Sequence, residues 1–86
     1  IKYNFNELFD RLSPSEQQIV LELSKYNQAV SREDLRQALS LSSIDLINGL
    51  QSLRKRYLVK TIESEKISFN LSPVFREYVR TCRQDL

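Results

Sequence analysis

Residues 42–73, SSIDLINGLQSLRKRYLVKTIESEKISFNLSP, contain the pattern that decides the fold. The first half has apolar residues at helical spacing behind a capping serine, which predicts a helix of about four turns. The buried stripe of this helix is predicted to be Leu46, Ile47, Leu50, Leu53 and Tyr57. Residues 58–62 and 67–71 follow as two strands joined by a polar turn, and Ser72-Pro73 begins another helix. Helix, hairpin and helix in this order predict a winged helix-turn-helix, mainly α with a small β-hairpin.

The segments before residue 42 supply the other helices of this fold. Residues 13–16 form a capping sequence, so a helix is predicted to begin at Pro14 and to end near residues 26–27, with Glu16 on a solvent-facing side. Its buried face is expected to hold Ile19, Val20, Leu23 and Tyr26. Val30 is a candidate edge strand, and Ser31 is predicted to cap a short helix that ends at about Ser40.

Both ends of the chain are also predicted to be helical. Residues 1–12 form a leading helix or a linker from an upstream domain, because helical spacing is present at Tyr3, Phe5, Leu8, Phe9 and Leu12. Residues 13–82 form the winged-helix core, and residues 1–86 are one domain. In the last helix, the buried side is predicted to hold Val74, Phe75, Tyr78, Val79 and Cys82.

Composition limits the class of protein. The chain has 86 residues, of which 41% are hydrophobic and 28% charged, as expected of one small globular domain. It starts at Ile1 and contains no methionine, so we expect a segment excised from a longer polypeptide. Because no apolar run approaches the roughly 20 residues of a membrane span and no signal-peptide pattern begins the chain, a cytoplasmic location is expected.

The residue types that catalysis requires are scarce. The chain has no histidine, one cysteine and no glycine-rich phosphate loop, so we expect no catalysis by this segment and no metal site. The carboxylates of Glu16, Asp34 and Asp45 fall in first helical turns, where negative charge complements the helix dipole. The only glycine, Gly49, is interpreted as a point where a neighbouring helix approaches closely, in preference to a ligand contact.

A cluster of basic residues ends the second helix of the helix-turn-helix pair. Arg54, Lys55 and Arg56 are placed either to contact phosphates or to complement the helix dipole, and one of them is a candidate to pair with a carboxylate elsewhere. Residues 42–86 carry eight basic and five acidic side chains, against five and six in residues 1–41, so the second half is the electropositive one.

Other polar residues bear on the same choice of partner. Asn48 and Gln51 are candidates for reading base edges in DNA. Three acidic residues oppose a polyanion, namely Asp45, Glu63 and Glu65. A second group of arginines in the last helix is either a solvated face or a patch that meets an acidic neighbour, and consists of Arg76, Arg80 and Arg83.

Three stretches of the sequence carry a resemblance to a known family. FDRLS at residues 9–13, SLRKRYLV at 52–59 and FNLSPVFREYV at 69–79 together resemble the winged-helix domain of bacterial NB-ARC ATPases of the type that carries WD repeats, over roughly residues 5–82. The resemblance implies a STAND-class signalling ATPase with ADP or ATP bound elsewhere in the parent protein. This domain would then be a non-catalytic regulatory module that docks on the upstream nucleotide-binding domain, holds the ADP-bound inactive state and precedes the downstream repeats.

One motif of the family is incomplete in this chain. The family's Met-His-Asp sequence corresponds to Leu71, Ser72 and Pro73, so the histidine that reaches the ADP phosphate and the aspartate are both absent. Ser72 is a candidate for a phosphate contact, but we favour the interpretation that it caps the last helix. The alternative to docking is a DNA-binding domain of a transcriptional regulator, which duplex binding with a steep salt dependence would reveal.

Overall fold

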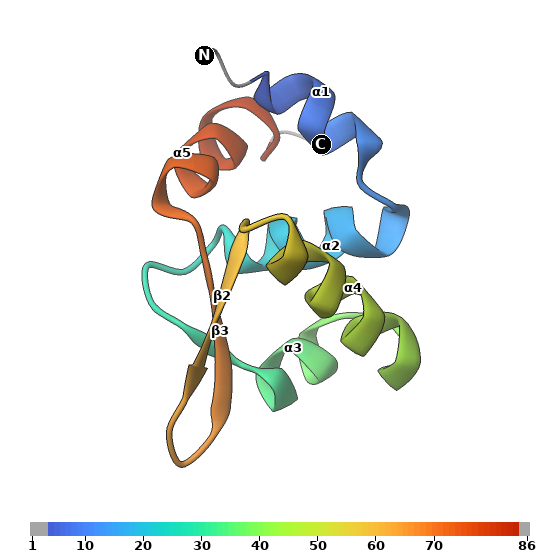
Figure 1. The fold of residues 1–86 in the computed structure, drawn as a ribbon, viewed down its shortest axis with the longest axis vertical. Coiled ribbons are helices and arrows are strands. Elements are labelled where there is room, and N and C mark those ends of the chain that lie inside the picture. The colour runs from blue at the N-terminus through green and yellow to red at the C-terminus, as the bar shows by residue number, and fades with distance from the viewer. Residues whose placement is uncertain (1–3, 85–86) are drawn as a thin grey trace.

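The computed structural model describes residues 4–84, and within them the chain forms five helices and one three-stranded antiparallel sheet (Figure 1). In chain order the elements are α1 (Phe5–Arg11), α2 (Pro14–Leu23), β1 (Val30–Ser31), α3 (Arg32–Ala38), α4 (Ser43–Lys55), β2 (Val59–Glu63), β3 (Ile67–Leu71) and α5 (Pro73–Cys82). The predicted winged helix-turn-helix is confirmed, with α3 and α4 as the helical pair and β2 and β3 as the wing. Tyr3 lies outside the described residues. No helix within residues 4–84 combines the length and the apolar character needed to cross a bilayer.

Strand β3 is the centre of the sheet, because the strand order is β1-β3-β2. The edge strand predicted at Val30 is present and pairs with Phe69. The hairpin register runs from Val59 opposite Leu71 to Glu63 opposite Ile67. Phe69 and Leu71 on β3 are buried, whereas the alternating residues Ser68 and Asn70 are only half-buried, so one face of the hairpin lies against the helices.

Serine residues cap three of the helices as predicted. The hydroxyls of Ser13, Ser31 and Ser42 each accept a hydrogen bond from the backbone N–H three residues later, at 3.0–3.2 Å. Ser72 precedes α5 but its side chain makes no capping hydrogen bond, so the interpretation of this hydroxyl as a cap is wrong. The backbone N–H of Ser72 instead donates to the carbonyl of Leu58 at 2.8 Å, which fixes the start of α5 beside the start of the hairpin.

Helix α4 ends in a Schellman motif that the sequence pattern did not reveal. The N–H of Leu58 donates to the carbonyl of Leu53 and the N–H of Tyr57 to that of Arg54, both at 3.0 Å. Tyr57 occupies the left-handed position of this motif with φ 61°, a position that glycine usually fills. The predicted burial of Tyr57 is therefore wrong: its side chain is turned off the stripe and is 90% exposed.

Four other residues that were predicted to be buried are exposed. Tyr26 lies beyond the end of α2 at Leu23, so the helical period no longer applies to it. Ile47 lies on the side of α4 that faces the hairpin and is 40% exposed. Val74 lies in the first turn of α5 and is 67% exposed. Cys82 is the last residue of α5 and is also exposed, which corrects its predicted place in the core.

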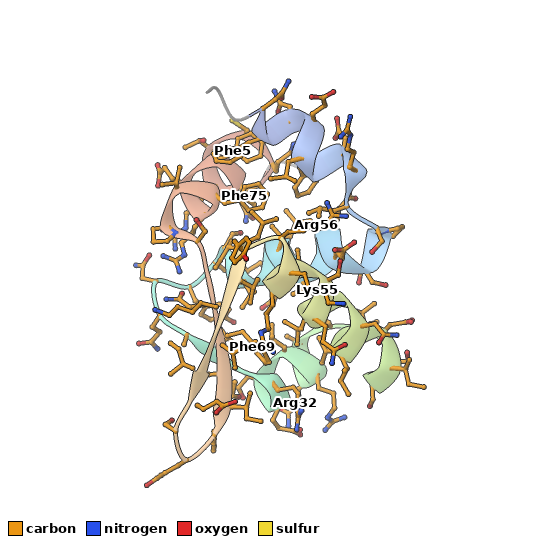
Figure 2. All side chains as sticks on the ribbon, in the orientation of Figure 1. Phe5, Arg32, Lys55, Arg56, Phe69 and Phe75 are labelled. Atoms are coloured by element: carbon orange, nitrogen blue, oxygen red, sulfur yellow. The ribbon has the colours of Figure 1, made fainter. Side chains whose placement is uncertain are left out.

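The leading helix α1 packs against α5 at the end of the molecule away from the hairpin tip (Figures 1 and 2). The ring of Phe5 lies 5.3 Å from that of Phe75 and 5.4 Å from that of Tyr78, as centroid distances. These aromatic contacts make the leading segment a helix of the same folded unit. The segment is therefore not an extended linker.

Gly49 lies at the contact between α2 and α4. A Cβ atom on this residue would lie 2.6 Å from Cδ1 of Ile19, which is completely buried. The prediction of a close helix approach is confirmed, because only the missing side chain lets the two helices lie at this distance.

The end of α4 is tied to the start of α2 by Glu16, which is only 6% exposed, so its predicted solvent-facing position is wrong. One carboxylate oxygen accepts from the Ser13 N–H at 2.9 Å, and the other lies 3.8 Å from Nε of Arg56. The predicted pairing of one basic residue with a carboxylate is thus confirmed for Arg56. Burial raises the pKa of Glu16, but the Ser13 N–H, the hydroxyls of Ser52 and Ser13 and the charge of Arg56 together lower it below its usual value.

Gly49→Ala is expected to lower the free energy of unfolding by about 1 kcal/mol, because overpacking of about 1–3 kcal/mol exceeds the gain of up to about 1 kcal/mol in helix propensity. Urea unfolding measures the change. The matched background is Ile19→Val, which removes the clashing Cδ1 atom. In that background Gly49→Ala is expected to be neutral or stabilising, and an equal loss in both backgrounds would contradict the packing argument.

Glu16→Gln is expected to destabilise the domain at neutral pH by about 1 kcal/mol, since glutamine keeps the capping hydrogen bond but loses the charge. The folded-state pKa of Glu16 lies below its unfolded value, so the stabilisation from this carboxylate is present above pH 4.5 and is lost as pH falls through the folded-state pKa. Urea unfolding over a pH series should therefore show the two proteins converging in acid. Glu77→Gln on the exposed side of α5 is the charge control, and an identical effect there would refute the assignment to Glu16.

Candidate functional site

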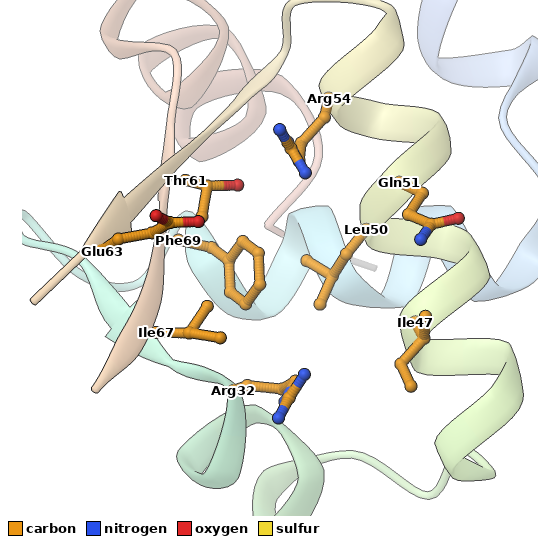
Figure 3. Close-up of a pocket in the computed structure, with 9 residues that line it drawn as sticks. All are labelled: Arg32, Ile47, Leu50, Gln51, Arg54, Thr61, Glu63, Ile67 and Phe69. Carbon is orange, nitrogen blue, oxygen red and sulfur yellow. The ribbon is translucent and has the colours of Figure 1, made fainter. Parts of the chain in front are cut away.

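A groove lies between α4 and the hairpin, on the side where the second helix of the pair is exposed (Figure 3). Its volume is about 150 Å³. We call it the α4–hairpin groove, and its lining consists of Arg32, Ile47, Leu50, Gln51, Arg54, Thr61, Glu63, Ile67 and Phe69. Leu50 and Phe69 are buried and form an apolar floor, whereas Ile47 and Ile67 are about 40% exposed and form the walls. The groove therefore combines apolar surface with charged rims.

Two arginines reach this groove from different elements. Arg54 comes from the last turn of α4 and Arg32 from the first residue of α3, and Figure 3 shows them at opposite ends of the groove. Neither guanidinium group makes a salt bridge or hydrogen bond within residues 4–84. No hydrogen bond or salt bridge among these residues therefore occupies either guanidinium group, although the hydrogen bond from Arg36 and, less strongly, the charge of Arg32 help to lower the pKa of Glu33.

Sequence reasoning missed Arg32, although a signal was present. A basic residue at the first position of a helix opposes the helix dipole, so local structure does not explain its presence after Ser31.

The exposed face of α4 continues the groove towards the start of the helix. Asn48, Gln51 and Lys55 are exposed, and the side chain of Ile44 is 70% exposed. The two amide side chains that are candidates for reading base edges are thus both exposed. Asp45 is exposed on the same helix, and both acidic residues of the hairpin are exposed at its tip, so the surface carries charges of both signs.

The basic triplet is divided between different roles. Arg54 lines the groove and Lys55 is exposed beside it, while Arg56 is engaged with Glu16. Two residues of this triplet, Arg54 and Lys55, consequently make no salt bridge within residues 4–84.

The arginines of α5 are occupied inside the domain. Arg76 donates to the side-chain carbonyl of Asn70 and to the backbone carbonyl of Leu71, the latter at 3.0 Å. Arg80 donates to the backbone carbonyl of Ser24 at 2.6 Å. The expectation of a solvated face is therefore wrong for these two residues.

Arg83 completes this internal use of the α5 arginines. Its guanidinium group lies 3.0 Å from the carboxylate of Asp10, donates to the Tyr78 hydroxyl at 2.9 Å and sits 4.5 Å above the ring of Phe9. It joins α5 to α1. Most acceptors of the three arginines are backbone carbonyls or residues distant in the sequence, so helical spacing alone did not identify them.

A second, more open hollow of about 340 Å³ lies where the hairpin meets the start of α5. We call it the α5 hollow, and it is lined by Tyr57, Leu58, Val59, Lys60, Asn70, Leu71, Ser72 and Pro73. It includes the positions that correspond to the Met-His-Asp motif. Ser72, whose hydroxyl makes no capping bond, is one of its lining residues.

The described residues show no group of three or more histidine, cysteine, aspartate or glutamate side chains arranged to hold a metal ion. The α4–hairpin groove offers guanidinium, amide, hydroxyl and carboxylate groups around an apolar floor. This set is suited to binding an anionic or amphipathic partner.

No family model and no curated protein matches the sequence. Among solved structures, the ST1889 protein of the thermoacidophilic archaeon Sulfolobus tokodaii is similar, with 18% identity and a TM-score of 0.70 over 90% of this chain and 78% of that one. The type III plasmid segregation protein TubR is similar with 15% identity and a TM-score of 0.75 over 100% of this chain and 91% of that one. The shared property is the fold.

Proposed function

We propose that this domain is a DNA-binding module of a regulatory protein, which contacts duplex DNA through the exposed face of α4 and the neighbouring hairpin. The observation that carries the proposal is the set of cations that make no salt bridge or hydrogen bond within residues 4–84 and lie beside the exposed amides of α4, namely Arg32, Arg54 and Lys55. In helix-turn-helix proteins the second helix enters the major groove and the surrounding basic residues contact phosphates.

Each side chain has a distinct part in this proposal. Asn48 and Gln51 project from α4 and have the paired donor and acceptor groups that recognise adenine in the major groove. Arg54 and Lys55 contact phosphates on one side of the DNA major groove, and Arg32 contacts phosphates from the start of α3. The exposed side chain of Ile44 is available for apolar contact with a thymine methyl group.

The acidic residues set the expected strength of binding. Asp45 on α4 and the two glutamates of the hairpin tip repel phosphates, so only about three cations are expected to make productive contacts. The logarithm of the association constant is then expected to fall with the logarithm of salt concentration with a slope of about −3. The similarity to a plasmid segregation protein supports a function on DNA.

Arg54→Gln and Lys55→Gln are each expected to weaken binding to mixed-sequence duplex DNA and to reduce the magnitude of the salt slope by about 1. Fluorescence anisotropy over a salt series measures both quantities. Arg11→Gln is the matched control, because it removes one exposed positive charge from α1 and is expected to change neither. Absence of low-salt binding by the unsubstituted domain, or an equal loss in the control, would count against the proposal.

A second candidate function is docking within an NB-ARC signalling ATPase, and Tyr57 favours it. This residue is exposed and has an unfavourable left-handed backbone, so the packing of the described residues does not explain a tyrosine at this position. It lies in the α5 hollow together with Ser72, whose hydroxyl makes no capping bond. In this proposal Tyr57 and the exposed Val74 contact the upstream nucleotide-binding domain, and Ser72 contacts a phosphate of the ADP held there.

Tyr57→Gly is expected to raise the free energy of unfolding of this domain by about 1 kcal/mol, because glycine adopts the left-handed conformation without strain. If the docking proposal holds, the same change in the parent protein speeds ADP release, and Ser72→Ala does so too. Urea unfolding and a nucleotide-release assay measure the two effects, with Ser64→Ala at the hairpin tip as the control. A parent sequence without a Walker-type phosphate loop upstream would eliminate this candidate.

A further inference from the structure

We propose that the α4–hairpin groove binds a small monocarboxylate whose body is a single aromatic ring or a branched aliphatic group. Such a ligand is distinct from DNA and from a docking domain.

The size of the groove selects the body of the ligand. Its volume of about 150 Å³ is close to that of the roughly 150 Å³ apolar cavity, engineered in another protein, that binds benzene, and below the roughly 300–1,000 Å³ of pockets for drug-sized ligands. The floor is formed by the buried Leu50 and Phe69, and the partly exposed Ile47 and Ile67 face the opening from α4 and β3. One ring or branched chain placed between these isoleucines would remove their apolar surface from water.

The charges of the groove select the anionic group. Arg54 and Arg32 stand at opposite ends of the groove (Figure 3), and neither makes a salt bridge or hydrogen bond within residues 4–84. A guanidinium group matches the planar geometry of a carboxylate and binds it through two parallel hydrogen bonds. Glu63 also lines the groove and repels a second negative charge, which favours a monocarboxylate over a dicarboxylate.

A polar group without a partner supports the same site. The hydroxyl oxygen of Thr61 is buried and makes no hydrogen bond, and Thr61 lies in register with Phe69, whose ring forms the floor. Buried hydroxyls in proteins nearly always have a partner, so this orphaned group is suited to a ligand oxygen. It places a second polar contact directly beside the apolar floor.

The position of the site has a consequence that rests on the proposed DNA-binding function. Arg54 belongs both to the groove and to the cations assigned to phosphate contacts. A bound carboxylate would neutralise this residue and lower the affinity for DNA, so the ligand would act as an effector. Ligand binding itself does not depend on DNA binding.

The test is a titration of the ¹⁵N-labelled domain with benzoate, followed by NMR. Saturable shifts are expected at the amides of Leu50, Thr61 and Phe69. Benzamide, which lacks the charge, and acetate, which lacks the ring, are expected to bind at least about tenfold more weakly. Because Arg54 is exposed, Arg54→Gln is expected to preserve the spectrum of the folded domain and to weaken benzoate binding about tenfold.

Two further variants make the test specific. Thr61→Val removes the orphaned hydroxyl at nearly constant shape and is expected to weaken benzoate binding severalfold. Lys60→Gln is the matched control, because it removes a positive charge from the same strand at a residue that does not line the groove, and is expected to have no effect. Absence of saturable shifts up to about 20 mM benzoate, the weak end of small-ligand affinity, would overturn the proposal. Equal binding of benzamide or acetate, or an equal loss in Lys60→Gln, would overturn it as well.

Competition separates this proposal from the DNA-binding one. At constant ionic strength, benzoate is expected to weaken DNA binding by the unsubstituted domain, and an unchanged affinity for DNA despite saturable NMR shifts would overturn the effector role alone. If the domain binds no DNA, the NMR titration still decides whether the groove holds a carboxylate.

Discussion

The close contact between α2 and α4 is the constraint on which the rest of the domain depends. Ile19 occupies the space that a side chain at position 49 would fill, and Glu16, in the first turn of α2, reaches the end of α4 through Arg56. Helix α4 is therefore fixed along its length and about its axis. Since one face of α4 is buried against α2, the opposite face, with its amides and cations, has a defined direction towards solvent. The groove exists because the hairpin leaves from the end of this fixed helix.

The arginines show how a similar residue pattern leads to different roles. Those of α5 are drawn inward because acceptors from α1, α2 and β3 lie within reach, and a charged donor gains most where a carbonyl would otherwise lack a partner. Arg32 and Arg54 have no such acceptor among the described residues. The net charge of a segment consequently indicates its partners only when the charged side chains that bind acceptors within the domain are left out of the count. The positive charge beside the α4–hairpin groove that has no internal hydrogen bond or salt bridge among the described residues belongs chiefly to α3 and α4.

The sequence was sufficient to predict the order of elements, the serine caps of α2, α3 and α4 and the hairpin, because each depends on local backbone chemistry that a few neighbouring residues determine. It was not sufficient where tertiary geometry decides. Tyr57 continues the helical period of α4, yet the Schellman motif turns it outward, and no glycine marked the end of the helix. Ile47 has the same period but faces the hairpin, whose position is a tertiary property. The α4–hairpin groove could not be predicted from the sequence, because its two walls come from α4 and β3, which lie side by side only in the folded domain.

The two candidate surfaces meet at the end of α4 and differ in the physics of recognition. Arg54 faces the groove, whereas Tyr57, three residues later, belongs to the α5 hollow because the left-handed turn redirects the chain. In the proposed DNA contact beside the groove, recognition is dominated by charge and is weakened by salt, because every phosphate contact releases counterions. Recognition at the α5 hollow relies on an aromatic ring, an exposed valine and a neutral hydroxyl, so its free energy comes from apolar burial, which salt does not weaken in the same way. One domain can therefore carry both surfaces, and the response to ionic strength assigns a binding partner to one of them.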